Sequence, residues 1–247
     1  MTTEMIASFD GVVLAVHRMG AGRPVVMLHG LFSDAQTNWV RFGHAAKLVE
    51  AGFEVVMPDL RAHGHSSKPH EPADYPEDVL VRDVQALVTS FGLGEFDLVG
   101  FSLGSRTAAR AVISGLAPRR LVLSGMGLEG LAGWARRAHF FIDAIDRYDE
   151  IHMGDPAFFA KSFMKTQKVD RVAARLLLQS VGDTTPEQLA AITMPTLVLC
   201  GSEDRDNGSP HALAEALPDA QLAEIQGTHM SSVTESALGE QLVSFLQ

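Results

Sequence analysis

The chain has 247 residues, enough for one large hydrophobic core or for a core with a small insert. Its 30 acidic and 20 basic residues give a formal net charge of −10, which disfavours nucleic acid and anionic membrane surfaces as partners. The one cysteine, Cys200, cannot form an internal disulfide, and we find neither a signal peptide nor an apolar run long enough to span a membrane. We therefore expect a cytoplasmic protein.

The first half of the chain alternates short apolar stretches, typical of buried strands, with amphipathic stretches typical of helices. Asp10-Gly11 predicts a hairpin turn between strands at 4–9 and 12–18. Further strands are predicted at 25–28, 53–57, 97–101 and 120–123, and helices at 39–50, 78–91 and 106–113. Residues 59–76, with no hydrophobic period, predict a loop. The alternation predicts an α/β fold with a mostly parallel sheet and helices on both faces.

Residues 127–183 interrupt this alternation, because no strand-like stretch of comparable strength occurs there. The segment has a helical pattern and many aromatic residues, which predicts either a small helical cap over a site or part of the outer helix layer. We prefer the cap, so the predicted domains are a core of residues 1–126 and 184–247 and a cap insert of residues 127–183. The rest is predicted to form helices at 185–192, 211–217 and 234–245 and strands at 196–200 and 221–225.

A Gly-x-Ser-x-Gly motif centred on Ser102 lies between a predicted strand and a predicted helix. A sharp turn at such a junction lifts the serine hydroxyl clear of the backbone, and the flanking glycines let strand and helix pass closely. We therefore predict that Ser102 is a nucleophile and that the N–H of Leu103 binds an oxyanion. The turn after the 25–28 strand, His29-Gly30-Leu31, is predicted to supply a second donor, the N–H of Leu31.

A serine nucleophile needs a base to take its proton and an acid to orient that base, and both are predicted in loops after later strands. Asp204 follows the 196–200 strand, and His229 follows the 221–225 strand. They occur in the order serine, acid, histidine, and the carboxyl ends of parallel strands bring such loops together. Asp206 in the same loop and Glu129 farther away are rival acids.

These stretches together resemble the α/β-hydrolase superfamily over almost the whole chain. The motifs that carry the resemblance are His29-Gly30-Leu31-Phe32, Pro58-Asp59-Leu60-Arg61-Ala62-His63-Gly64-His65-Ser66, Gly100-Phe101-Ser102-Leu103-Gly104, Gly201-Ser202-Glu203-Asp204 and Gly227-Thr228-His229-Met230. The resemblance implies eight strands, a cap after the sixth, and a structural role for Asp59, His63 and His65. Ala62 departs from the family's usual glycine, and Phe101 stands where many members have histidine or asparagine.

Apolar side chains near the predicted site are candidates for the substrate pocket, since such pockets are mostly apolar. Phe32 adjoins the predicted oxyanion turn. Trp134 and Phe140 belong to the predicted cap, and the alternative role for such aromatic residues is to pack the cap onto the core. Arg136 and Arg137 could bind a substrate carboxylate, although a solvated helix face is the more common role of such a pair.

The predicted function is hydrolysis of a carboxylic ester, lactone or thioester through an acyl-enzyme on Ser102. The same groups could perform carbon–carbon bond hydrolysis, acyl transfer or perhydrolysis, although the residues around Ser102 do not match the Asn-Ser-Met-Gly-Gly of the family's carbon–carbon hydrolases. A serine nucleophile disfavours epoxide hydrolases and dehalogenases, which use a carboxylate. A ligand-binding receptor on the same fold is an alternative of a different class.

Two further patterns in the sequence point to other chemistry but are weak. Residues 125–130 match Gly-x-Gly-x-x-Gly, yet no second strand ending in an acid follows at the spacing that dinucleotide-binding oxidoreductases need. Asp59, His63 and His65 could bind a metal, but two histidines in one loop are a poor ligand set. We therefore expect no metal, no cofactor, and a small-molecule acyl substrate as the partner. No feature of the sequence indicates whether the protein is a monomer or an oligomer.

Overall fold

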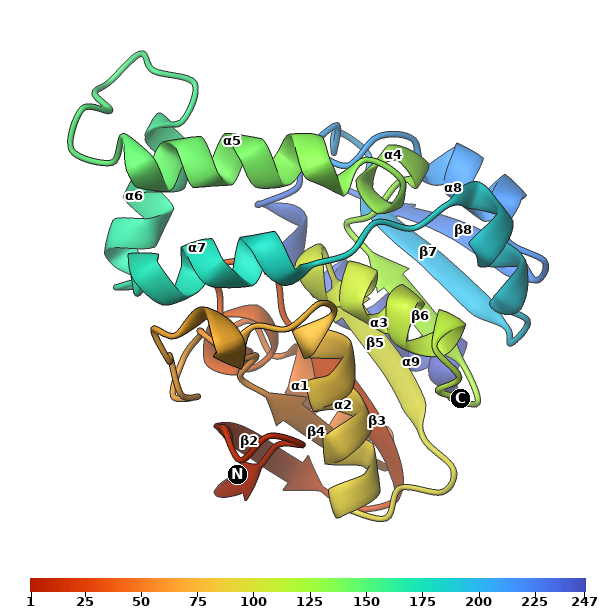
Figure 1. The fold of residues 1–247 in the computed structure, drawn as a ribbon. Coiled ribbons are helices and arrows are strands. Elements are labelled where there is room, and N and C mark those ends of the chain that lie inside the picture. The colour runs from red at the N-terminus through yellow and green to blue at the C-terminus, as the bar shows by residue number, and fades with distance from the viewer.

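The computed structural model describes residues 1–247, and eight strands form one sheet in the order β1-β2-β4-β3-β5-β6-β7-β8 (Figure 1). The two pairings that involve β2 are antiparallel, and the five others are parallel. The predicted eight-stranded, mostly parallel sheet is thus confirmed. The strands are β1 (Thr2–Ala7), β2 (Val13–Gly20), β3 (Arg23–Leu28), β4 (Phe53–Pro58), β5 (Asp97–Phe101), β6 (Leu121–Ser124), β7 (Thr196–Gly201) and β8 (Ala220–Ile225).

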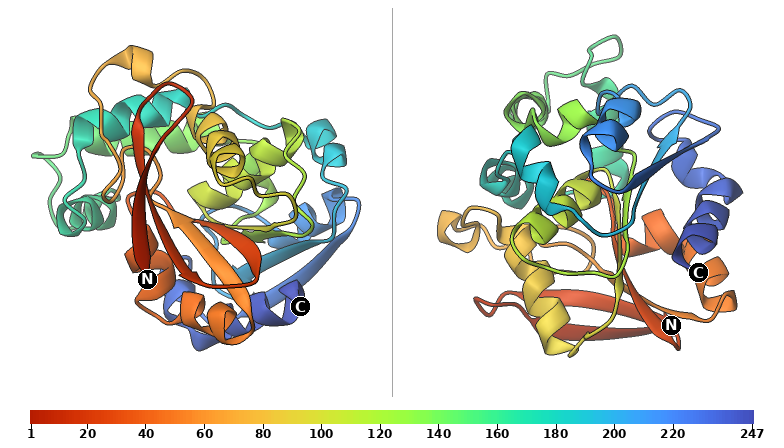
Figure 2. Two further views of the ribbon diagram at one scale, coloured as in Figure 1. Left: turned by 90° about the horizontal axis from the view of Figure 1, so that it is seen from below. Right: turned by 90° about the vertical axis from the view of Figure 1, so that its right-hand side faces the viewer.

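Helices cover both faces of the sheet, as the right-hand view in Figure 2 shows. On one face lie α1 (His44–Glu50) and α9 (Ser236–Leu246); on the other lie α2 (Val79–Ser90) and α3 (Leu103–Ile113), with α8 (Pro210–Ala216) near β7 and β8. Successive side chains of a strand point to opposite faces, so Leu98 joins the core on the α3 side while Val99 joins the core on the α9 side. This explains why the strands are continuous apolar runs.

Residues 127–183, here called the helical insert, contain no strand and form four helices between β6 and β7. These are α4 (Leu128–Leu131), α5 (Trp134–Asp146), α6 (Phe158–Thr166) and α7 (Arg171–Ser180). In Figure 1 the helices α5, α6 and α7 lie beside the end of the sheet from which α3 begins. Asp170 begins α7, because its carboxylate accepts hydrogen bonds from the N–H groups of Val172 and Ala173.

Arg106 ties both ends of the helical insert to α3. Its guanidinium is fully buried and donates to the carbonyl oxygens of Gly130 and Leu131 at 2.7 Å each, and also to Gly182 and to the carboxylate of Asp183. Burial lowers the pKa of Arg106 to about 10, so the side chain stays charged at neutral pH. Because Arg106 lies one helical turn after Ser102, the insert is fixed relative to that serine.

Two predicted helices differ from those in the structure. The predicted helix at 39–50 is interrupted: a π-helical turn, η1 (Gln36–Val40), is separated from α1 by Gly43, whose φ of +82° no α-helix can contain. The predicted helix at 185–192 is a 3₁₀ helix, η3 (Pro186–Ala191). Thr185 precedes this helix and Pro186 occupies its first position, where the missing N–H costs no hydrogen bond.

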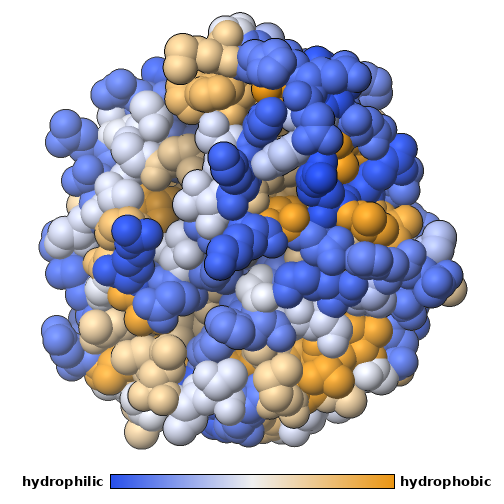
Figure 3. Space-filling view, turned by 90° about the vertical axis from the view of Figure 1, so that its left-hand side faces the viewer, coloured by the Kyte–Doolittle hydropathy of each residue, from blue (hydrophilic) through white to orange (hydrophobic).

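Two short 3₁₀ turns, η2 (Pro72–Asp74) and η4 (Ser232–Thr234), complete the secondary structure. None of the helices combines the length and the apolar composition needed to cross a lipid bilayer. The face shown in Figure 3 is mostly hydrophilic, and polar or charged side chains separate its apolar areas.

Candidate active site

Ser102 occupies a strained turn between β5 and α3. Its φ of +53° and ψ of −112° are unfavourable for a residue with a side chain, and its N–H donates to the carbonyl of Ser124 at 2.9 Å. The flanking glycines make the turn possible. A Cβ at Gly100 would lie 2.4 Å from the carbonyl of Gly104, and a Cβ at Gly104 would lie 2.1 Å from the carbonyl oxygen of Leu28. Strand and helix can therefore cross here only without side chains.

The side chains of Ser102, His229 and Asp204 form a continuous chain of hydrogen bonds. The Nε2 atom of His229 lies 3.0 Å from the Oγ of Ser102, and its Nδ1 atom lies 2.8 Å from the Oδ2 of Asp204. Because an ionised carboxylate only accepts hydrogen bonds, Nδ1 carries the proton and Nε2 accepts from the serine hydroxyl. The structure thus brings together the three residues predicted from the sequence.

Asp204 is held as a carboxylate even though it is buried. Burial by itself would raise its pKa, but hydrogen bonds from His229 and from the N–H of Asp206 outweigh this effect and lower the pKa of Asp204. The two rival acids have other contacts. Asp206 contributes only its N–H to Asp204, and the carboxylate of Glu129 accepts the N–H of Ser209 at 2.8 Å.

Two backbone N–H groups beside Ser102 are without an acceptor in the chain. They belong to Leu103, the first residue of α3, and to Leu31 in the turn after β3. A Cβ at Gly30 would lie 3.5 Å from the Cβ of Ser102, so this turn runs directly past the serine. Asn38 supports the turn, since its Oδ1 accepts the N–H of Gly30 at 3.0 Å. Its buried Nδ2 has no partner.

The loops after β3 and β4 hold each other through two buried histidines. In the first loop, His29 accepts the N–H of Leu60 at 2.9 Å; in the second, His63 accepts the N–H of Phe32 at 3.0 Å. The Nδ1–H of each imidazole donates a hydrogen bond to a backbone carbonyl. Because one ring nitrogen accepts and the other donates, both rings are neutral. This reciprocal pair fixes the turn that carries the N–H of Leu31.

His63 gives the stability of the protein a specific pH dependence. Burial, with a contribution from His29, lowers the pKa of His63 to about 3. Below the unfolded pKa of about 6.5 only the unfolded chain gains this proton, so we expect the free energy of unfolding to fall by about 2 kcal/mol between about pH 7.5 and pH 5 from this group. Urea unfolding across that range measures the loss.

His63→Gln is the matched control for this pH dependence, because its side-chain oxygen can still accept the N–H of Phe32 but does not titrate. We expect a variant that is less stable at pH 7.5 and whose unfolding free energy declines less steeply with acid. A slope equal to that of the parent protein would contradict a neutral, buried His63.

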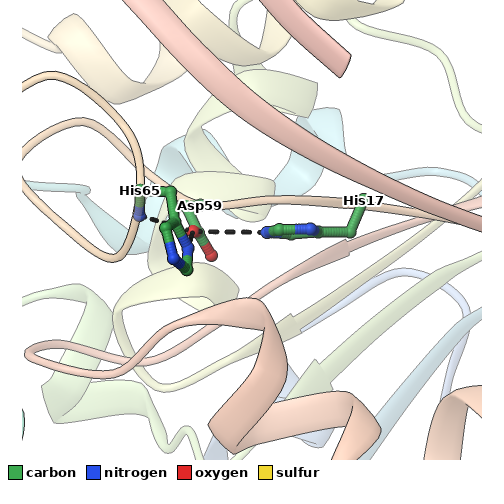
Figure 4. A group of neighbouring side chains, drawn as sticks. All are labelled: His17, Asp59 and His65. Carbon is green, nitrogen blue, oxygen red and sulfur yellow. Dashed lines mark hydrogen bonds and ion pairs between the residues drawn. The ribbon is translucent and has the colours of Figure 1, made fainter. Parts of the chain in front are cut away.

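Asp59 ties the loop after β4 to β2 and to the turn after β3. Figure 4 shows its carboxylate between His17 and His65; Oδ2 lies 3.3 Å from the Nε2 of His17 and 2.7 Å from the backbone nitrogen of His65. Its Oδ1 accepts the N–H of Ala35 at 2.9 Å. The hydrogen bond to Asp59 raises the pKa of His17. His17, Asp59 and His65 bring three potential metal-binding atoms together here, but the oxygens of the carboxylate already accept hydrogen bonds from N–H groups.

A cavity of about 1220 Å³ opens beside Ser102 and His229. The helical insert forms one wall, and the turn after β3 and the loops after β7 and β8 form the others. The three predicted pocket residues, Phe32, Trp134 and Phe140, all line it. The indole of Trp134 is fixed by a hydrogen bond to the carbonyl of Leu178.

A family model described as the alpha/beta hydrolase family matches residues 25–240, which covers the whole site. The chain belongs to this family. As an alpha/beta hydrolase it is 27% identical over 223 residues to the AB hydrolase superfamily protein YisY of Bacillus subtilis, with 81% of each chain covered. It is 25% identical to the non-heme chloroperoxidase CPO-A1 of Kitasatospora aureofaciens over 253 residues, 89% of each. The solved structure of an esterase from Exiguobacterium antarcticum superposes with a TM-score of 0.80 at 20% identity over 99% of both chains.

In this hydrolase several residues of the cavity belong to no sequence motif. They are Asn38 and Arg41, in and just after the π-helical turn η1, and Arg205, in the loop after β7. Arg136 and Arg137, for which a solvated face was the simpler interpretation, also line the cavity. Cys200 is no rival nucleophile, because burial raises the pKa of its thiol to about 12.

Proposed function

We propose that this alpha/beta hydrolase is a serine hydrolase that cleaves a carboxylic ester, lactone or thioester through an acyl-enzyme on Ser102. The observation that carries the proposal is the hydrogen-bonded chain Ser102–His229–Asp204, which meets a large cavity beside two free backbone N–H groups. A nucleophile, a base, an orienting acid and oxyanion donors are the four parts that acyl transfer requires.

In the proposed mechanism Ser102 attacks the substrate carbonyl while the Nε2 of His229 takes the hydroxyl proton. Asp204 holds His229 in the required tautomer and stabilises the imidazolium. The N–H groups of Leu31 and Leu103 stabilise the oxyanion of the tetrahedral intermediate. His229 then protonates the leaving group, and a water activated by the same imidazole hydrolyses the acyl-enzyme and restores Ser102.

The helical insert would act as the predicted cap in this mechanism. Its aromatic side chains form an apolar wall that excludes water and accepts the acyl or alcohol part of the substrate. The bonds from Arg106 to both ends of the insert hold that wall in place over Ser102.

Perhydrolysis is the second candidate, because relatives named non-heme chloroperoxidases align along most of the chain. Hydrogen peroxide would then replace water in attacking the acyl-enzyme, so that a peracid and the free serine form. Comparing acid and peracid yields at rising peroxide concentration separates the two reactions. Carbon–carbon hydrolysis and transfer to alcohols are tested by the same product analysis.

Covalent labelling tests the proposed nucleophile directly. A fluorophosphonate probe reacts only with an activated serine, so we expect one adduct on the peptide that contains Ser102 and none in Ser102→Ala. Ser162→Ala is the matched control, because Ser162 also lines the cavity but bonds only to the carbonyl of Phe158. An unlabelled parent protein would favour a ligand-binding receptor with an idle site.

A further inference from the structure

The wall of the cavity carries positive charge in an otherwise acidic protein. The formal net charge of the chain is −10, yet the cavity is lined by five arginines and only two carboxylates. The carboxylates are Glu129 and Asp206; the arginines are Arg41, Arg106, Arg136, Arg137 and Arg205. Charge of one sign gathered in a cleft attracts small molecules of the opposite sign.

Four of these arginines have no carboxylate partner. Arg106 is paired with Asp183, but no carboxylate oxygen lies within 4.0 Å of Arg41, Arg136, Arg137 or Arg205. By contrast Arg61, the buried arginine outside the cavity, forms ion pairs with both Asp10 and Asp83. The four come from three separate segments: the end of η1, the start of α5 and the loop after β7. Segments far apart in sequence thus bring unpaired guanidinium groups to one cavity.

Arg137 is the best placed of the four. It is half-buried on α5, with its guanidinium carbon 5.6 Å from the centre of the Phe141 ring. Its Nη1 donates to the backbone carbonyl of Asp206, in the loop that also carries Asp204. The other edge of the guanidinium, formed by Nε and Nη2, has no acceptor. That edge offers two parallel N–H donors, the arrangement that binds a carboxylate through both oxygens.

We propose that the substrate of this hydrolase carries a carboxylate, bound by the Nε–Nη2 edge of Arg137 with added attraction from Arg136. The inference rests on the proposed function and narrows its substrate class to esters, lactones or thioesters with an anionic group at one end. The aromatic walls would hold the hydrocarbon part between that group and Ser102. One planar guanidinium edge beside apolar walls fits a carboxylate better than a phosphate, which takes more donors.

Two esters with the same leaving group test the proposal. Mono-p-nitrophenyl glutarate carries a terminal carboxylate, and the p-nitrophenyl ester of 5-methylhexanoic acid has a neutral group of the same shape there. We expect kcat/KM to favour the glutarate ester by about tenfold or more, and Arg137→Gln to remove this preference by lowering kcat/KM for the glutarate ester much more than for the neutral ester. Raising the salt concentration should weaken the preference in the parent protein.

Arg82→Gln is the matched control, because Arg82 is also unpaired but lies outside the cavity, against Phe9. It should leave both rates unchanged. The proposal is overturned if the parent protein prefers the neutral ester, or if Arg137→Gln lowers both rates equally, which would show a structural role. Turnover of the neutral ester alone would leave the serine hydrolase function intact.

Binding supplies a readout that needs no turnover. Glutarate should raise the melting temperature of Ser102→Ala as it does that of the parent protein, and should not raise that of Arg137→Gln, with sodium chloride of equal ionic strength as the control. No rise in either of the first two proteins overturns the carboxylate site, whatever the outcome of the serine labelling.

Discussion

Ser102→Ala is expected to lower kcat for a p-nitrophenyl ester by at least about 10³-fold, the scale of effect seen when a triad nucleophile is removed. The variant lacks the oxygen on which the proposed acyl-enzyme would form, while the N–H groups of Leu31 and Leu103 would still polarise the substrate carbonyl. Steady-state kinetics with p-nitrophenyl esters of increasing chain length measure the loss and identify the preferred acyl group.

The fold should survive this substitution, which separates lost chemistry from lost structure. The backbone of Ser102 is in a strained conformation that alanine tolerates as well as serine does. The hydrogen bond from the N–H of residue 102 to the carbonyl of Ser124 is also retained. The melting temperature should therefore stay within a few degrees of the parent value. Ser162→Ala should keep full activity. Ester turnover retained by Ser102→Ala would remove the serine from the mechanism.

The parts of this site that could be predicted from sequence are those that local chemistry determines. Gly100 and Gly104 mark the turn at Ser102 because no side chain fits where β5 crosses α3. Asp204 and His229 are predictable because short apolar strands precede them, and a parallel sheet brings its carboxyl ends to one edge. The hydrogen bonds of 2.8 and 3.0 Å then follow from the fold.

The remaining parts depend on contacts between distant segments. His29 and His63 each accept an N–H from the other's loop, 31 residues away, and neither position has a local pattern that predicts this exchange. The sequence does not predict the break at Gly43, because helical spacing of apolar residues continues across it, although the φ of +82° ends the helix. Arg41 and Arg205 belong to no motif, and only the packing of η1 and of the loop after β7 around the cavity brings them together with Arg136 and Arg137.

Asp204→Asn is expected to lower kcat by about 10³- to 10⁴-fold with little loss of stability. The carboxylate now accepts the Nδ1–H of His229, which leaves Nε2 free to take the proton of Ser102. An asparagine amide in the same place can donate to Nδ1, and the imidazole then carries its proton on Nε2, where it cannot act as a base. The rate of labelling by a fluorophosphonate should fall in parallel with kcat.

Asp206→Asn is the control that distinguishes the two acids of this loop. The contacts of Asp206 to Asp204 and Arg137 use its backbone N–H and carbonyl, which asparagine keeps. We expect kcat within about threefold of the parent value, in line with a conservative change at an exposed side chain. If Asp206→Asn instead lost activity and Asp204→Asn kept it, Asp206 would be the residue that orients His229, and the loop would have to rearrange when substrate binds.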